Sequence, residues 1–210
     1  GDAYYNLGVP GGNYVTIDHA FHYADSLANL RNVVVQVSFR GMHVGQNFDI
    51  YAEPAAILER PRSYVYNRRV IEAAGLNVYS ALFPNSLKYD VPGDDQWRSV
   101  LDAERAAAES WTMDTTVYER LQRIADRCKA KSARLLFVEY PTHPDLQQLI
   151  QETGLGPLRE TYFAHLRTMA PVLDLDQPGM FPADRSFWRD PLHLTIEAQR
   201  ALIPLIWEDR

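Results

Sequence analysis

The sequence predicts an α/β protein built on a doubly wound, mainly parallel sheet. Strand-like runs rich in Val, Leu and Phe alternate with amphipathic helical segments along most of the chain. Small and polar residues also gather in the segments that follow the strands, and in a parallel sheet these segments meet at one edge. The expected architecture is therefore a three-layer α/β/α sandwich.

The first expected element is a short strand over residues 3–9, which runs into a Pro-Gly-Gly loop. The apolar spacing of residues 14–30 then predicts a helix. Residues 32–39 contain the run Val-Val-Val-Gln-Val-Ser-Phe, which is typical of a strand covered on both faces. These segments follow one another in the strand–helix–strand order of a parallel sheet.

An irregular stretch rich in Tyr, Asn, Pro and Arg follows at about 42–115. Short helical pieces are expected within it at 55–58, 66–74 and 96–110. Because the composition does not shift enough to mark a linker, we interpret the stretch as an insertion over one edge of the sheet. The sequence then predicts a single domain over residues 1–210.

Regular alternation returns after the insertion. Helix, strand, helix, strand and helix are expected in that order over residues 116–130, 134–140, 158–169, 171–175 and 195–207. The last of these helices contains Pro204, which is expected to kink or end it because proline has no backbone N–H.

Composition and charge exclude several classes of function. The formal net charge of −6 argues against a nucleic-acid partner, because phosphate binding usually needs a clustered basic face. No cofactor or metal is expected: His19 and His22 have a helical spacing, and no third ligand accompanies them. The single cysteine, Cys128, lies in an amphipathic segment and is expected to be a packed small hydrophobe.

The strongest chemical signal is the segment 187–195, FWRDPLHLT. The spacing of Asp190 and His193 lets the carboxylate accept a hydrogen bond from one imidazole nitrogen and fix the tautomer. The other nitrogen can then take a proton from a hydroxyl. The alternative interpretation is a capping Asp beside a partly buried His.

The position of this turn, just before the last helix, resembles the terminal block of the SGNH (GDSL-like) hydrolases. Segment 5–13, YNLGVPGGN, is similar to the second block of that family, in which a glycine N–H faces the oxyanion. Alignment with that block selects Gly11 for this role, with Asn13 as a further substrate contact. The alternative for this loop is a plain turn that needs small residues. The resemblance covers most of the chain apart from the insertion, and it implies a flavodoxin-like sheet.

This sequence departs from the family pattern at two of the blocks. Arg40 stands where the third block has an oxyanion-binding Asn, and is expected either to stabilise negative charge or to be a salt-bridged structural residue. The first block should supply a serine nucleophile, but Gly1-Asp2-Ala3 offers no hydroxyl. The first strand and its serine are therefore expected upstream of this chain, and Ser38 is the internal alternative.

His143 leaves the end of a predicted strand between two prolines, so it could line the pocket or be a structural loop residue. The resemblance implies a serine esterase or O-acyltransferase in which the serine attacks an acyl ester. His193 would act as general base and then general acid, Asp190 would orient it, and Gly11 with Arg40 would hold the oxyanion.

Within the superfamily, the two blocks look most like the cell-surface branch. That branch includes the D-alanine transfer protein of teichoic acid and the O-acetyltransferases of exopolysaccharides. The resemblance implies an acyl ester or glycan substrate, an extracytoplasmic place in a bacterial envelope and a membrane anchor outside this chain. Two alternatives stay open: a non-catalytic SGNH-like domain that binds a glycan or a protein, and an unrelated doubly wound domain.

Overall fold

The computed structural model describes residues 13–46 and 93–207, together with the isolated positions 71, 75, 78, 79 and 82. The chain divides into two compact units, one of Gly1–Phe48 with Val91–Arg210 and the other of Asp49–Asp90. The strands and helices treated below belong to the first unit. A single domain with an insertion at about 42–115 stays a prediction.

Some expected elements lie outside the described residues. The strand at 3–9, the helical piece at 55–58 and most of the piece at 66–74 are among them. The third expected piece of the insertion, at 96–110, is present as helix α5, Asp94–Glu109.

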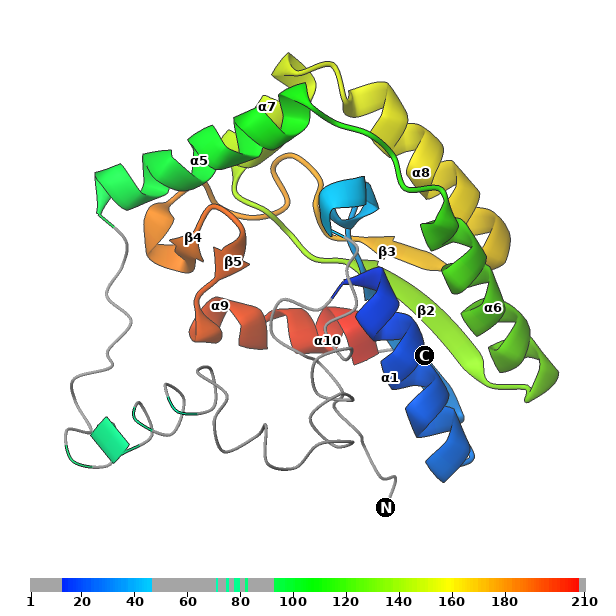
Figure 1. Ribbon diagram of the computed structural model, residues 1–210. Helices are drawn as coiled ribbons and strands as arrows, with labels where there is room; N and C mark the ends of the chain where they lie inside the picture. Colours follow the sequence, from blue (N-terminus) through cyan, green and yellow to red (C-terminus); the bar gives the residue numbers. More distant parts are fainter. Residues whose placement is uncertain are drawn as a thin grey trace. The chain divides into compact units, whose positions relative to one another are not determined.

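The three described core strands form a parallel sheet, which confirms the α/β class (Figure 1). They are β1 (Asn32–Val37), β2 (Arg134–Glu139) and β3 (Val172–Asp174), and their order in the sheet follows their order in the chain. Each strand ends one or two residues earlier than the sequence indicates. Their carboxyl ends therefore share one edge of the sheet.

Apolar side chains cover both faces of β2, as the continuous apolar run predicts. Phe137 lies in one cluster with residues of three helices, α1 (Tyr14–Leu27), α6 (Thr116–Ala130) and α8 (Gly156–Met169). Leu136 and Val138 point to the opposite face and lie in a second cluster, which includes Trp97 of α5 and Trp188. Successive side chains of β2 point to opposite faces of the sheet, so this one strand contributes to two separate apolar clusters.

The helices of the first face follow the predicted pattern, with small differences at their ends. Helix α1 ends at Leu27 rather than at residue 30, and α8 begins two residues before the expected start at 158. Among the described helices, none combines the length and the apolar character needed to cross a bilayer.

The expected last helix at 195–207 is interrupted, as the proline within it indicates, and consists of two short helices. Helix α9 (Ile196–Arg200) and helix α10 (Leu202–Trp207) are separated at Ala201. The cause is Pro204, whose ring clashes with the carbonyl four residues earlier, that of Arg200. Helix α9 therefore ends at Arg200, whose carbonyl cannot accept a hydrogen bond from Pro204.

Helix α7, Pro144–Glu152, is absent from the sequence-based prediction. Pro144 occupies its first turn, a position that tolerates a missing N–H, and His143 caps it. The buried residues Leu146, Leu149 and Ile150 have the spacing of one helix face, so the signal was present but short.

Cys128 is buried on α6, with 3% of its surface exposed, and packs in the first apolar cluster. Burial, together with the negative charge of Asp25, raises the pKa of its thiol to about 11. The cysteine therefore behaves as the packed small hydrophobe that the sequence indicates.

Candidate functional site

Asp190 and His193 lie on a short antiparallel hairpin of β4 (Trp188–Asp190) and β5 (His193–Leu194), drawn in orange in Figure 1. The fully buried Trp188 anchors the hairpin, and its indole N–H donates to the carbonyl of Pro182 at 2.8 Å. Thr195 follows the hairpin directly and caps helix α9. Local turn chemistry therefore fixes the distance between the two side chains.

The Asp190 carboxylate holds one side of the imidazole. His193 Nδ1 lies 2.8 Å from both carboxylate oxygens, and the backbone N–H of Leu192 donates to Oδ1 at 2.8 Å. Since an ionised carboxylate only accepts, Nδ1 carries the proton and Nε2 of the neutral ring is the basic nitrogen. The His193 side chain is 52% exposed and that of Asp190 is 18% exposed.

The ionised form of Asp190 is favoured in this setting. Partial burial by itself would raise the pKa of Asp190, but hydrogen bonds from His193 and from the Leu192 N–H outweigh burial and lower it. The carboxylate therefore stays charged at neutral pH and can stabilise a positive charge on the imidazole.

His143 attaches this hairpin to the loop that follows β2. Its backbone N–H donates to the carbonyl of Pro191, the residue after Asp190, at 2.9 Å. Its ring lies edge-on to two tryptophans, with centroids 4.7 Å from Trp97 and 5.3 Å from Trp188. The hairpin is thereby held at the carboxyl edge of the parallel sheet.

Both ring nitrogens of His143 have structural partners. Nδ1 accepts from the backbone N–H of Asp145 at 3.1 Å and so caps α7, while Nε2 lies 3.0 Å from the carbonyl oxygen of Ala183. A carbonyl only accepts, so Nε2 is the protonated nitrogen. With 3% of its surface exposed, His143 supports the hairpin rather than lining an open cleft.

His143→Ala is expected to lower the free energy of unfolding by about 2 kcal/mol, through loss of a helix cap and of a buried hydrogen bond. His143→Asn is expected to recover about half of this loss, because Asn is itself a good N-cap. Urea unfolding followed by tryptophan fluorescence measures both variants. Wild-type stability in His143→Ala would contradict the structural role.

Arg40 belongs to the short 3₁₀ helix η1, Arg40–Met42, which follows β1. Its guanidinium forms a two-pronged ion pair with Glu104 of α5, and the Nε–Oε2 distance is 2.5 Å. This geometry corresponds to the salt-bridged structural residue that the sequence left open as one alternative.

Asn13 and Ser38 also have backbone or capping contacts. Asn13 is buried and caps α1: its Oδ1 accepts from the N–H of Thr16 at 3.0 Å, and its Nδ2 donates to the carbonyl of Gln46 at 2.9 Å. Ser38 is half-buried just after β1, where its backbone N–H donates to the Tyr14 hydroxyl at 2.7 Å. Gly11 lies outside the described residues, so its expected meeting with His193 stays a prediction.

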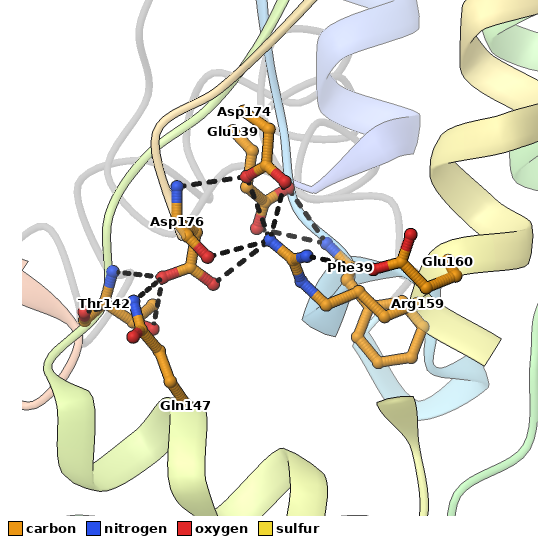
Figure 2. Close-up of polar contacts among 8 residues, drawn as sticks. All are labelled: Phe39, Glu139, Thr142, Gln147, Arg159, Glu160, Asp174 and Asp176. Carbon is orange, nitrogen blue, oxygen red and sulfur yellow. Dashed lines mark hydrogen bonds and ion pairs between the residues drawn. The ribbon is translucent and has the colours of Figure 1, made fainter. Parts of the chain in front are cut away.

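A buried charged cluster at the carboxyl edge of the sheet was not found from the sequence (Figure 2). Glu139 ends β2, Asp174 ends β3, and Asp176 follows two residues later. Arg159 of α8 donates to both carboxylate oxygens of Asp174, at 2.9 and 3.1 Å, and to the backbone carbonyl of Asp176 at 3.0 Å. The available signal was the acidic residue at the end of two neighbouring predicted strands.

Asp176 is tied to the loop after β2. Its Oδ1 accepts from the backbone N–H and the hydroxyl of Thr142, each at 2.7 Å, and from the Gln147 amide at 2.9 Å (Figure 2). Burial raises the pKa of Asp176 even though these hydrogen bonds oppose the shift. The loop that follows β2 therefore makes two connections: Thr142 binds Asp176, and His143 binds the β4–β5 hairpin that carries Asp190 and His193.

Glu139 is a buried carboxyl whose oxygens accept from the backbone N–H of Phe39, at 3.2 and 3.4 Å. Burial, and then the negative charge of Asp176, raise the pKa of Glu139 well above its usual range. Because the folded protein holds this proton more tightly than the unfolded chain does, stability falls as pH rises from the ordinary Glu range toward the raised pKa.

Glu139→Gln is expected to remove this loss of stability, because the amide keeps an acceptor for Phe39 and cannot ionise. The difference in melting temperature, variant minus wild type, should grow as the pH is raised from 4 to about 8, a range that starts near the unperturbed Glu pKa. Glu160→Gln is the control, since Glu160 is largely exposed. A difference independent of pH would contradict the role given to Glu139.

Neither His19 nor His22 takes part in a cluster suited to a metal. His22 Nε2 lies 3.4 Å from Asp18 Oδ1, one helical turn earlier, as in a helix surface pair. Within residues 13–46 and 93–207, and at the few positions described between them, no three His, Cys, Asp or Glu side chains are grouped to hold a metal ion.

Comparison with known proteins identifies no protein significantly similar to this chain. A scan against protein-family models finds no match, and searches of curated proteins and of solved structures find no significant match. The SGNH resemblance therefore stays a prediction, and function is inferred from residues and their geometry.

Proposed function

We propose that this chain carries the acid–base part of an SGNH-type serine esterase or O-acyltransferase. In this proposal His193 removes the proton from an attacking serine hydroxyl and then delivers it to the leaving oxygen. Asp190 fixes the tautomer and stabilises the imidazolium that forms between these steps. The substrate would be an acyl ester of a cell-surface polysaccharide, in a protein held at the bacterial envelope.

The observation that carries the proposal is the oriented and accessible imidazole. The Asp190 carboxylate, which accepts from the Leu192 N–H, lies 2.8 Å from Nδ1, whereas the ring is about half exposed and Nε2 has no hydrogen-bond partner among the described residues. A structural histidine in the same protein, His143, is instead buried with both nitrogens bonded. The contrast favours proton transfer for His193.

The proposed fold is the three-layer, doubly wound sandwich, with the first strand upstream. Two apolar clusters on opposite faces of β2 support it, as does the hairpin at the carboxyl edge of the sheet. The proposal requires a serine hydroxyl within hydrogen-bond reach of His193 Nε2. That serine is expected before Gly1, and Ser38 is the internal alternative. Since Arg40 and Asn13 have structural partners, the oxyanion is assigned to the Gly11 N–H.

The experiment is hydrolysis of p-nitrophenyl acetate by the protein that includes the upstream sequence. His193→Ala is expected to reduce the rate to that of buffer. His22→Ala is the matched control, because His22 also pairs with an aspartate and is similarly exposed, 48% against 52%. Equal rates for His193→Ala and wild type would remove His193 from the mechanism.

A second candidate is a non-catalytic SGNH-like domain that binds a glycan or a protein partner. It is favoured by one observation: Arg40 and Asn13, two of the residues expected near the oxyanion, serve an ion pair and a helix cap instead. This alternative predicts no hydrolysis above that of buffer by the wild-type protein.

A further inference from the structure

A cavity of about 220 Å³ opens to solvent beside the buried charged cluster. It lies between helix α7 and the loop that follows β3, and its apolar lining includes Pro144, Ile150 and Pro178. Its polar lining consists of three amides and two charged groups: Gln147, Gln148, Gln151, Arg159 and Asp176. None of the residues given a catalytic role above contributes to it.

We propose that this cavity binds a small, uncharged, hydroxyl-rich ligand of the size of a single sugar ring. Its volume is below the roughly 300–1,000 Å³ of pockets that bury drug-sized ligands. A pyranose would place its hydroxyls against the amides and its C–H faces against the two prolines.

The buried polar group at the base of the cavity is Asp176, which is 4% exposed. Thr142 and Gln147 supply three hydrogen bonds to its Oδ1 (Figure 2). Within the part of the chain that the structure describes, its Oδ2 makes only a longer ion-pair contact, 3.7 Å from Arg159. A carboxylate oxygen has room for further donors, and a ligand hydroxyl in the cavity would supply one.

Two of the three glutamines, Gln147 and Gln148, use amide hydrogens within the protein and keep their carbonyl oxygens for a ligand. Both amide hydrogens of Gln147 are engaged, by the Thr142 carbonyl at 3.1 Å and by Asp176 at 2.9 Å. The amide nitrogen of Gln148 donates to Glu152 at 2.7 Å. Their carbonyl oxygens have no hydrogen-bond partner among the described residues, so the lining favours a ligand rich in O–H donors.

The charges argue against an ionic ligand. Arg159 is the only cationic group of the lining, and it is shared by Asp174 at 2.9 Å and Asp176 at 3.7 Å. An anion such as phosphate would meet a guanidinium already neutralised and a carboxylate that repels it. An ammonium group would have to compete with Arg159, which already is the cationic partner of Asp176. A neutral polyol is the ligand class that avoids both conflicts.

The test is a titration of the ¹⁵N-labelled protein, observed through the side-chain amide signals of Gln147, Gln148 and Gln151. D-Glucose and N-acetyl-D-glucosamine are the neutral probes, and inorganic phosphate and spermidine are the charged ones. Saturable shifts of these signals are expected with at least one sugar and with neither charged probe. The same titration of His193→Ala should be unchanged, so its outcome is independent of the proposed acyl transfer.

Gln148→Trp, which fills the cavity mouth, should weaken sugar binding at least tenfold. Gln122→Trp is a matched control, because Gln122 is also an exposed helical Gln bonded to an acidic residue four positions later, at 2.8 Å. It should bind within twofold of wild type. Gln151→Trp replaces Gln148→Trp if the latter does not fold. Absence of saturable sugar shifts, equal binding by the cavity variant and the control, or binding of phosphate or spermidine in place of sugar would each overturn the proposal.

Discussion

Asp190→Asn is expected to lower ester hydrolysis by about 10³- to 10⁴-fold, because an amide at this position favours the wrong imidazole tautomer. The Asn carbonyl oxygen is the group that can accept from the Leu192 N–H, at the place of Oδ1. The amide NH₂ then occupies the place of Oδ2, 2.8 Å from His193 Nδ1, and donates to it. The proton moves to Nε2, which can no longer act as the base.

The measurement is the rate of p-nitrophenyl acetate hydrolysis across the pH range, with the melting temperature as a check on folding. Asp184→Asn is the control in the same loop: Asp184 is exposed and caps the short turn before β4, a role that Asn also fills. A rate for Asp190→Asn within twofold of that for Asp184→Asn would show that the hydrogen bond does not set the tautomer during turnover.

Arg159→Ala is expected to lower the free energy of unfolding by about 3–5 kcal/mol, the usual cost of breaking a buried ion pair from one side. The Arg159 side chain is 11% exposed and is the cation that faces the buried carboxyls of Asp174 and Asp176. Its guanidinium also lies 4.5 Å from the ring centroid of Phe163. Removal leaves the carboxyls without a counter-charge and opens a void beside the ring.

The Arg159→Ala loss should shrink as the pH is lowered. Burial already raises the pKa of Asp176, and without the opposing charge of Arg159 this pKa rises further, so the variant loses more stability than the wild type as pH rises above the ordinary Asp range. Arg105→Ala is the control, since Arg105 and its partner Glu152 are both more than 40% exposed and solvent screens their pair, which therefore contributes little to stability. Urea unfolding at two pH values measures both. Equal losses in the two variants would contradict the account.

The sequence predicts the three described core strands because each is a short apolar run whose alternate residues fill different cores. Phe137 and its neighbours Leu136 and Val138 give this signal without knowledge of the rest of the chain. Pro204 indicated the break at Ala201, but the short helix α7 was not predicted, because it begins in a segment with two prolines. Helices of two turns give too few apolar repeats for the pattern to be distinctive.

The Asp190–His193 contact could be predicted because it depends on a spacing of three residues within one turn. The charged cluster could not, because Arg159 lies on a helix while Glu139 ends β2 and Asp174 ends β3, and only the sheet register brings them together. The neighbouring sequence likewise could not show whether Arg40 and His143 have structural or substrate-binding roles. Their partners, Glu104 and Ala183, are 64 and 40 residues away.

Because Cys128 is buried, the alkylation rate of this single thiol measures how often the folded protein opens. Thiolate is the species that reacts with iodoacetamide, and a pKa of about 11 together with 3% exposure leaves very little of it accessible in the closed fold. Alkylation will then proceed only as fast as helix α6 separates from its neighbours. Its rate reports that local or global event directly, without an engineered label.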